Sequence, residues 1–242
     1  MSELVPQPPE LGPNEIHLWL VSLHSDLPLP LADPDTFLSS DEKNRAERLR
    51  VPEKRLQFVL GRNLLRCILA GYLSQPPRSL VFRYGPYGKP LDFPLLDGRR
   101  LHYNLSHSKD WLGLAVTLDR CIGIDLEWQN PHLDILSVAQ RFFAPDETEW
   151  LVRRPADLKR QDFYNIWTRK EAFLKASGDG FNLPSNSFSL PLRPVLVPGH
   201  LAEFSFRNET WFLGDFQTPL YYFGSLVADR RWDSFNYLDF QS

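Results

Sequence analysis

Two carboxylates stand close together in the segment Gly123-Ile124-Asp125-Leu126-Glu127. If the segment is a strand, its side chains alternate between two faces, so Asp125 and Glu127 share one face while Ile124 and Leu126 share the other. Two carboxylates one pleat apart repel each other unless water solvates them or a cation holds them. Mg²⁺ favours oxygen ligands and often takes one or two carboxylates together with substrate phosphates, so the pair is a candidate metal site. A half-exposed strand with a polar outer face explains the same pattern without a metal.

Trp167, Glu171 and Lys175 recur at four-residue steps in a helix predicted over residues 158–177. This spacing places the three side chains on one helix face. A surface ion pair between Glu171 and Lys175 is one interpretation, and such a pair contributes about 0.3–0.5 kcal/mol. The functional interpretation makes Glu171 a third metal carboxylate and Lys175 a partner for a phosphate or a base.

Further polar residues gather in Asn104-Leu105-Ser106-His107-Ser108, after a predicted strand. They form either a polar strand end with turn-forming side chains or a set of hydrogen-bonding groups suited to a phosphate, with His107 as an acid/base candidate. Lys89 places one cation on the constrained turn Gly88-Lys89-Pro90. Residues 43–66 hold eight Lys and Arg, most of which we expect to solvate two helices.

The elements that must position these residues alternate in a regular order. The predicted elements of the first half are a strand over 16–23, helices over 41–50 and 52–71, and strands over 80–84, 101–105 and 112–118. Those of the second half are a strand over 122–128, helices over 135–141, 145–153 and 158–177, and strands near 188, 202–206, 211–216 and 221–228. We predict an α+β fold of two similar lobes in a pseudo-twofold arrangement, with the active site in the cleft between them. The lobes would be residues 1–118, of which 1–13 are expected to be flexible, and 119–242.

Composition narrows the class of protein. The 242 residues are 43% hydrophobic and 24% charged, as in an ordinary globular protein. No apolar run long enough for a membrane span and no signal peptide is found, so we expect a cytoplasmic protein. Cys67 and Cys121 are expected to be small buried hydrophobes without a disulfide. The net charge of −3 argues against a nucleic-acid-binding protein.

In their order and spacing, these motifs closely resemble the 4′-phosphopantetheinyl transferases of the surfactin-synthetase-activating (Sfp) type. The resemblance covers residues 41–188, roughly. Its marks are Gly88-Lys89-Pro90, Asn104 to Ser108, Gly123 to Glu127, Arg141-Phe142-Phe143 with Glu147, and Trp167 to Gly180.

The resemblance implies an enzyme that moves 4′-phosphopantetheine from coenzyme A to a serine of an apo acyl or peptidyl carrier protein and releases 3′,5′-ADP. It implies that Asp125, Glu127 and Glu171 hold Mg²⁺, with Mn²⁺ as an alternative. The positions that it assigns to coenzyme A are Arg45, Lys89, Pro90, Asn104, Ser106, His107, Asp125 and Lys175. Arg55 and Arg62 are alternatives to Arg45, because a shift of the helix register in this region would bring a different arginine to the coenzyme A position.

The resemblance also implies a catalytic set of Glu147, Glu171 and Lys175. It leaves open whether Glu147 or Lys175 removes the serine proton, because a carboxylate does so efficiently only with a tuned pKa and geometry. Phe142 and Phe143 either dock the carrier protein or belong to the core, and we expect at least one of them in the core. With both lobes in one chain, we expect a monomer.

Two other functions fit parts of the pattern. Metal-dependent nucleases also combine acidic ligands with a Glu and a Lys, but they typically place the lysine two residues after the glutamate, whereas Glu171 and Lys175 are four apart. A non-catalytic module that binds coenzyme A or a carrier protein would be expected to lack a metal carboxylate, yet Asp125, Glu127 and Glu171 are all present.

Overall fold

The computed structural model describes residues 4–23, 27–86, 88–192 and 201–240. Its helices are α1 (Ser40–Arg48), α2 (Pro52–Leu73), α3 (Ile135–Phe142), α4 (Pro145–Arg153) and α5 (Ala156–Ser177). Its strands are β1 (Glu15–Ser22), β2 (Phe93–Pro94), β3 (Arg100–Ser108), β4 (Trp111–Leu118), β5 (Ile122–Trp128), β6 (Ala202–Phe206), β7 (Glu209–Asp215), β8 (Tyr222–Ala228) and β9 (Ser234–Leu238). Short 3₁₀ turns are η2 (Leu29–Ala32), η3 (Pro77–Ser79), η4 (Gly180–Asn182) and η5 (Ser185–Ser187).

Local signals in the sequence set the helix ends. Ser39 caps α1 in a capping box with Glu42, which satisfies backbone N–H groups of the first turn. Pro52 occupies the first turn of α2, where its missing N–H costs nothing. Gly178 ends α5 with a left-handed φ of 76°, a conformation that glycine adopts without strain.

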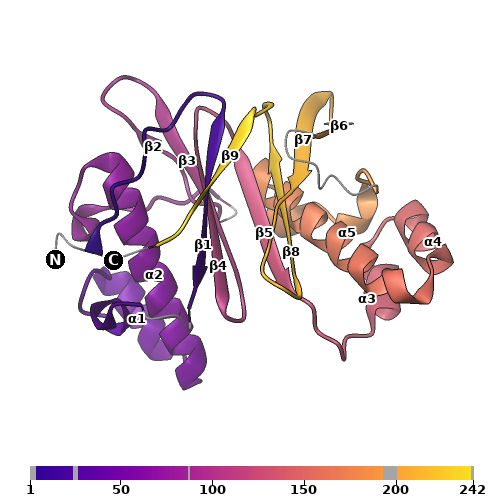
Figure 1. The fold of residues 1–242 in the computed structure, drawn as a ribbon, viewed down its shortest axis with the longest axis horizontal. Coiled ribbons are helices and arrows are strands. Elements are labelled where there is room, and N and C mark those ends of the chain that lie inside the picture. Colours follow the sequence, from indigo (N-terminus) through magenta and orange to yellow (C-terminus); the bar gives the residue numbers. More distant parts are fainter. Residues whose placement is uncertain (1–3, 24–26, 87, 193–200, 241–242) are drawn as a thin grey trace.

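The strands form two sheets, and helices cover the outer face of each. The first sheet has the order β2-β3-β4-β1-β9 and the second the order β5-β8-β7-β6. Figure 1 shows α1 and α2 beside the first sheet, and α3, α4 and α5 beside the second. The predicted α+β class is confirmed. Strand β9 pairs in parallel with β1, so the end of the chain joins the first sheet, and the division into two lobes at residue 118 remains a prediction.

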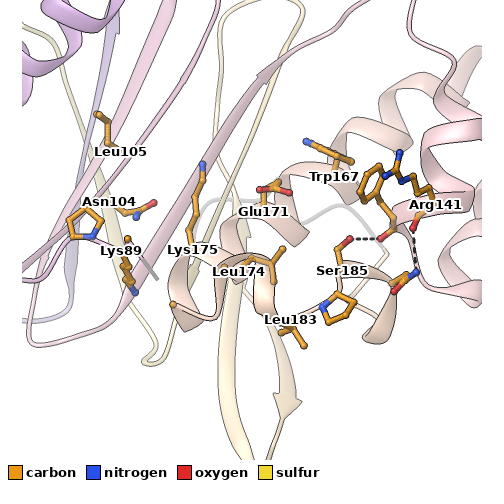
Figure 2. Close-up of a pocket in the computed structure, with 17 residues that line it drawn as sticks. Lys89, Asn104, Leu105, Arg141, Trp167, Glu171, Leu174, Lys175, Leu183 and Ser185 are labelled. Atoms are coloured by element: carbon orange, nitrogen blue, oxygen red, sulfur yellow. Dashed lines mark hydrogen bonds between the residues drawn. The ribbon is translucent and has the colours of Figure 1, made fainter. Parts of the chain in front are cut away.

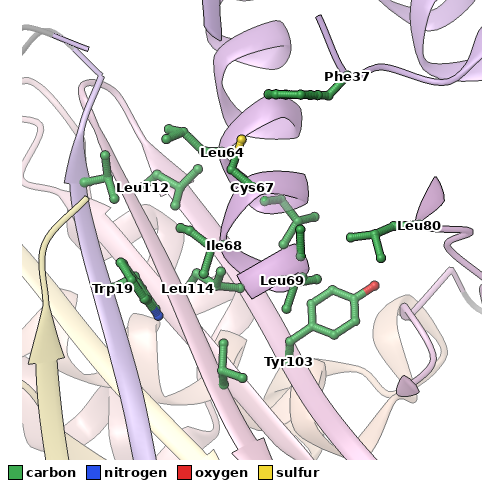
Figure 3. Packing of buried hydrophobic residues seen from close by; sticks show 14 of the residues in the cluster. Trp19, Phe37, Leu64, Cys67, Ile68, Leu69, Leu80, Tyr103, Leu112 and Leu114 are labelled. Atoms are coloured by element: carbon green, nitrogen blue, oxygen red, sulfur yellow. The ribbon is translucent and has the colours of Figure 1, made fainter. Parts of the chain in front are cut away.

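Apolar side chains fill the spaces between these layers. Leu64 and Ile68 of α2 pack against Leu112 and Leu114 of β4, and all four are fully buried (Figure 3). Another cluster joins the two sheets through side chains such as Ile124 of β5. Apolar burial contributes about 25 cal/mol per Å², so these contacts stabilise the packing of the two sheets and their helices.

Helix α5 lies directly on β5 because residue 123 is a glycine. A Cβ atom at Gly123 would lie 2.1 Å from the carbonyl oxygen of Ala172 and 2.4 Å from the backbone nitrogen of Ala176. The strand face that carries Asp125 is therefore covered by the helix, and Asp125 is only 3% exposed. The half-exposed strand considered from the sequence is wrong at this position.

Strands β3 and β5 belong to different sheets, and side chains of β3 link them. Asn104 accepts a hydrogen bond from the backbone N–H of Ile124 at 2.9 Å, and Ser106 accepts one from Leu126 at 3.2 Å. Ser108 continues the series with a 3.0 Å hydrogen bond from the N–H of residue 128. Every second side chain of β3 thus accepts a hydrogen bond from every second backbone N–H of β5.

Several local predictions differ from the structure. Residues 80–83 form no strand. The carbonyl of Leu80 accepts a hydrogen bond from Arg66, and the carbonyl of Arg83 accepts one from the N–H of Leu91. The segment around residue 188 follows η5 and is also not a strand.

The N-terminal segment, expected to be flexible, packs Leu11 and neighbouring side chains against the first core cluster, and residues 1–3 lie outside the described residues. Cys67 is buried as predicted, whereas Cys121 is partly exposed. Within the described ranges, no helix is long and apolar enough to cross a membrane.

We predict that Gly123→Ala destabilises the protein by roughly 3 kcal/mol or more, because the new methyl group meets helix backbone that cannot move aside. Urea unfolding would measure this. Gly61→Ala is the matched control: its Cβ would meet only the Leu112 side chain at 3.5 Å, so it should be neutral or stabilise α2 by about 0.5–1 kcal/mol. A Gly123→Ala variant as stable as the wild type would contradict the close packing of α5 on β5.

Candidate active site

A hydrogen-bonded cluster joins β3, β5 and α5 at the meeting of the two sheets. The Lys175 ammonium lies 2.7 Å from Asp125 Oδ1 and donates to Ser106 Oγ and to the carbonyl of Ile124, both at 3.0 Å. Ser106 in turn donates to Asp125 Oδ1 at 3.0 Å. Lys175 therefore pairs with the β5 carboxylate, not with Glu171 one helical turn before it.

The three predicted metal carboxylates influence one another. Burial raises the pKa of Glu127 to about 7, and the Asp125 carboxylate adds to that shift. Burial also raises the pKa of Glu171, again with a contribution from Asp125, while Lys175 opposes it. Three carboxylates that disfavour one another's charge are a place where an additional cation is stabilising.

The chemistry of the carboxylates fits a divalent cation. Asp125 Oδ2 is buried and has no hydrogen-bond partner among the described residues, and a buried carboxylate oxygen without a partner is costly. Oxygen ligands of this kind suit Mg²⁺. Across the described residues, no group of three His, Cys, Asp or Glu side chains is already arranged to hold a metal ion. The donor set fits the metal, and its ligation remains a prediction.

A cavity of about 680 Å³ runs along α5 beside this cluster (Figure 2). Lys89 and Asn104 lie toward one end, Lys175 and Glu171 in the middle, and Trp167, Arg141 and Ser185 toward the other end. Pro90, Phe142, Leu174 and Leu183 also line the cavity. As the four-residue spacing predicts, Trp167, Glu171 and Lys175 face the same cavity.

Lys89 lies in the segment before β2 and contacts the end of α5. Its ammonium donates to the carbonyl of Ala176 at 2.5 Å, and its aliphatic chain would lie 3.3 Å from a Cβ at Gly178. Burial lowers the pKa of Lys89. The predicted coenzyme A residue thus lies at the cavity wall, and its ammonium already has a backbone acceptor.

His107 lies apart from the other predicted residues of β3. Strand alternation turns Asn104 and Ser106 toward β5 and leaves His107 on the opposite face, where it is exposed. The described residues that line the cavity do not include it. Although His107 has an exposed surface, the protein around its ring desolvates it and lowers its pKa, and the positive charge of Lys175 lowers it further.

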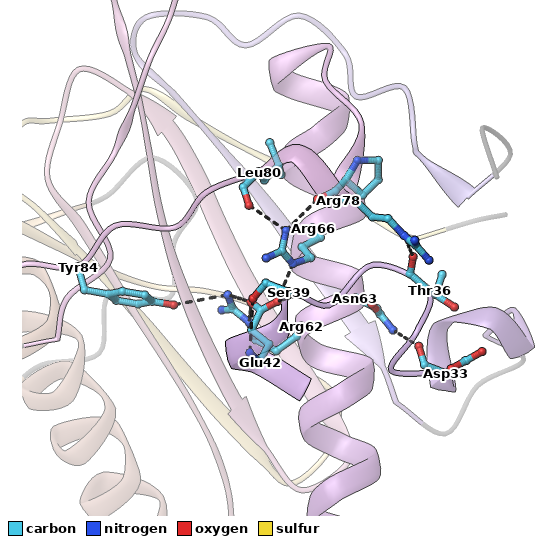
Figure 4. Close-up of polar contacts among 11 residues, drawn as sticks. Asp33, Thr36, Ser39, Glu42, Arg62, Asn63, Arg66, Arg78, Leu80 and Tyr84 are labelled. Carbon is cyan, nitrogen blue, oxygen red and sulfur yellow. Dashed lines mark hydrogen bonds and ion pairs between the residues drawn. The ribbon is translucent and has the colours of Figure 1, made fainter. Parts of the chain in front are cut away.

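Several basic residues of the first two helices have partners within the fold (Figure 4). Glu42 accepts hydrogen bonds from Arg62 and Arg66, and Arg66 also donates to two backbone carbonyls at 2.9 Å. Although burial opposes it, these guanidinium groups hold the pKa of Glu42 below its ordinary value. Arg45 is exposed, lies over the Phe58 ring at 5.2 Å, and is not among the described residues of the cavity. Arg55 is exposed on the first turn of α2.

Glu147 is fully buried on α4, away from the cluster. One oxygen lies 2.6 Å from the Lys170 ammonium and accepts from the N–H of Ala144, and the other accepts from the N–H of Leu190 at 2.9 Å. Burial lowers the pKa of Lys170, and Glu147 opposes that shift. The structure does not bring Glu147 together with Glu171 and Lys175, and its carboxylate already holds three donors.

The structure gives specific contacts to two residues for which the sequence left the role open, Ser108 and Phe142. Ser108, which lies on the same face of β3 as Asn104 and Ser106, donates to Glu127 Oε2 at 2.8 Å. The period of two in β3 was the signal that could have included it. Phe143 is buried, as expected for one of the two phenylalanines, whereas Phe142 is half-buried and lines the cavity.

Known proteins resemble this chain over most of its length. A family model described as the 4′-phosphopantetheinyl transferase superfamily matches residues 121–218. The 4′-phosphopantetheinyl transferase HetI of Nostoc sp. is 45% identical over 179 residues, which are 73% of this chain and 75% of HetI. A 4′-phosphopantetheinyl transferase of Bacillus subtilis is 32% identical over 72% of this chain and 76% of its own length. The 4′-phosphopantetheinyl transferase Sfp of Bacillus subtilis (strain 168) is 31% identical, with the same coverage.

The buried pair leads to a prediction about Glu147. Glu147→Gln alone should destabilise the protein by about 3–5 kcal/mol, because it leaves the Lys170 charge buried without a partner. Combined with Lys170→Met, it should recover most of that loss, since the glutamine still accepts from a backbone N–H. Urea unfolding of the single and double variants measures the recovery. A double variant that folds but has lost the activity of the wild type would identify Glu147 as a chemical participant.

The raised pKa of Glu127 predicts a pH dependence of stability. Its ordinary value is 4.5 and its folded value about 7, so the folded protein favours the protonated form and loses this contribution as pH rises through 7. Without divalent cations, Glu127→Gln should therefore stabilise the protein at pH 8 by roughly 1–3 kcal/mol and by less at pH 5.

Thermal unfolding in EDTA at both pH values measures this difference. Glu149→Gln, which changes an exposed carboxylate of α4, is the control and should show little effect at either pH. An equal effect of Glu127→Gln at pH 5 and pH 8 would contradict the raised pKa.

Proposed function

Because the chain belongs to the 4′-phosphopantetheinyl transferase superfamily, we infer that it is an enzyme that transfers 4′-phosphopantetheine from coenzyme A to a serine hydroxyl of an apo carrier protein. The products are 3′,5′-ADP and the holo carrier protein. The observation that carries this inference for the site is the cavity beside the Asp125–Lys175 pair, which is lined by the Lys89 and Lys175 ammonium groups and by the Glu171 carboxylate. Membership of this family supports neither of the two alternatives raised from the sequence, a metal-dependent nuclease and a non-catalytic binding module.

The reaction breaks a phosphoanhydride bond of coenzyme A and forms a phosphate ester bond to serine. The serine oxygen attacks the phosphorus that carries the pantetheine arm, and the bond from that phosphorus to the oxygen of the departing 3′,5′-ADP breaks. The serine proton must leave, and negative charge develops on the leaving phosphate. Such a step requires positioning and charge stabilisation more than covalent participation of the protein.

We assign the pyrophosphate of coenzyme A to the middle of the cavity. Lys175 supplies a cation there, and Asn104 and Lys89 line the end beyond it. A positively charged side chain next to the bond that breaks stabilises the charge that develops on the leaving group. Ser106 hydrogen-bonds to both Lys175 and Asp125, so we assign it the role of orienting these two side chains. Arg45 and His107 lie outside the described lining and remain predictions as coenzyme A ligands.

Asp125, Glu127 and Glu171 are the residues that would hold Mg²⁺. When bound, Mg²⁺ neutralises charge on the pyrophosphate and on the leaving phosphate. The free, buried Oδ2 of Asp125 and the mutual effect of the carboxylates on pKa support this assignment. Mn²⁺ shares the preference for oxygen ligands and would serve as an alternative.

We assign Glu171 to the cation, and removal of the serine proton by Glu147 or Lys175 stays a prediction. Glu171 lines the cavity, and burial raises its pKa, a shift that a bound divalent cation would oppose. The three ammonium hydrogens of Lys175 have acceptors in Ser106, Asp125 and the Ile124 carbonyl, which suits a cation more than a base. Glu147 then acts as a buried partner of Lys170, one residue before Glu171. The monomeric state and the cytoplasmic location remain predictions.

Loss of the β5 carboxylate tests the proposed chemistry. Asp125→Asn should lower the rate of transfer at least 100-fold while the protein still folds, because the change removes a charge and hardly alters the volume. Intact-mass spectrometry of an apo acyl or peptidyl carrier protein, incubated with enzyme, coenzyme A and Mg²⁺, would measure the gain of one phosphopantetheine.

Circular dichroism would verify folding, and Glu149→Gln, which alters a surface carboxylate, should transfer at the wild-type rate. Near-normal transfer by Asp125→Asn would overturn the role of this carboxylate. Absence of any mass gain with the wild-type enzyme, despite binding of coenzyme A, would overturn the assigned reaction for that carrier.

A further inference from the structure

The serine hydroxyls that link β3 to β5 each make two kinds of hydrogen bond. Ser106 accepts from the N–H of Leu126 and donates to Asp125, the residue before it. Ser108 repeats the pattern two residues later: it accepts from the N–H of Trp128 at 3.0 Å and donates to Glu127 Oε2 at 2.8 Å. Each serine thus holds one carboxylate of β5 and the next backbone N–H of the same strand.

The two serines differ in what else they touch. A hydroxyl offers one donor and two acceptor sites. Ser106 uses all three, because Lys175 also donates to it at 3.0 Å. Within the described part of the chain, Lys175 donates to Ser106, Asp125 and the Ile124 carbonyl and not to Ser108, which lies beside a second cavity that Glu127 and Trp128 also line. Replacing Ser108 therefore changes the support of Glu127 without removing a direct partner of Lys175.

The position of Glu127 depends on this support. Gly123, Asp125 and Glu127 share the strand face toward α5, and Glu127 is the least buried of the three. It also stands near the end of β5. The hydrogen bond from Ser108 fixes one carboxylate oxygen and leaves the other for a further partner. A carboxylate held in this way loses less conformational freedom when it binds a cation.

We propose that Ser108 is a positioning residue that orients Glu127 for the divalent cation and, through the Trp128 N–H, fixes the end of β5 against β3. The inference rests on the proposed function insofar as Glu127 is a ligand of that cation. Ser108 acts on the cation site, and coenzyme A binding in the absence of the cation does not depend on it.

Two variants test the proposal through cation binding. Mn²⁺ would be titrated into the full-length protein without coenzyme A, and free Mn²⁺ would be followed by electron paramagnetic resonance. Ser108→Ala should weaken Mn²⁺ binding about tenfold or more, as expected when a hydrogen-bond partner of a metal ligand is lost. Ser108→Thr retains a hydroxyl and should bind within about threefold of the wild type.

Ser137→Ala is the matched control. Ser137 donates to the Asp134 carboxylate at 2.6 Å near the start of α3, so this variant loses the same kind of hydrogen bond at an exposed position. It should bind Mn²⁺ like the wild type. Equal Mn²⁺ affinity of Ser108→Ala and wild type would overturn the role of Ser108, whereas a wild type that binds no Mn²⁺ would overturn the cation site itself.

Amide hydrogen exchange supplies a readout that involves no metal. In Ser108→Ala, the Trp128 amide loses its acceptor and should exchange at least tenfold faster, while the Ile124 amide, held by Asn104, should keep its rate. Unchanged exchange at Trp128 would show that Ser108 does not hold the end of β5. Coenzyme A affinity in EDTA should be the same in wild type and Ser108→Ala, and a loss there would place Ser108 in the coenzyme A site.

Discussion

The arrangement of the site depends on the repulsion among three carboxylates that the fold brings together. Asp125 and Glu127 lie on β5, and Glu171 approaches from α5, which packs on the strand at Gly123. Without compensating partners, three carboxylates buried this close together would have raised pKa values and would lose their charge. Lys175 compensates Asp125 directly, and Ser106 and Ser108 donate hydrogen bonds to the two strand carboxylates. The remaining negative charge makes the cluster suited to a cation, while the positive charge of Lys175 suits it to an anionic phosphate.

Helix α5 can hold its part of the site because its other faces are anchored. Arg169 is fully buried and donates to both oxygens of Asp215 on β7, and Lys170 pairs with Glu147 of α4. Removing one partner of such a buried pair is strongly destabilising, so these contacts specify how the helix is rotated. Glu171 and Lys175 follow on the face that remains, toward β5 and the cavity. The residues adjacent in sequence to the site thus serve the packing that orients it.

Much of this could be predicted from the sequence where the pattern is local. The period of two in β5 placed Asp125 and Glu127 on one face, and the four-residue steps placed Trp167, Glu171 and Lys175 together. Contacts between distant segments were not predictable in this way. The hydrogen bonds from β3 side chains to the β5 backbone, the pairing of Glu147 with Lys170, and the parallel addition of β9 all depend on tertiary packing. The strand expected at residues 80–84 does not form at 80–83, where the carbonyl of Leu80 accepts a hydrogen bond from Arg66.

The central claim is that the carboxylate cluster and Lys175 meet the pyrophosphate of coenzyme A. Phosphorus-31 relaxation of coenzyme A bound to the enzyme with Mn²⁺ tests it most directly, because the pyrophosphate and 3′-phosphate signals are separate and relaxation by Mn²⁺ falls steeply with distance. We expect strong enzyme-dependent broadening of the pyrophosphate signals and weaker broadening of the 3′-phosphate signal. Equal broadening of all signals, or none beyond that of Mn²⁺ and coenzyme A without protein, would contradict it.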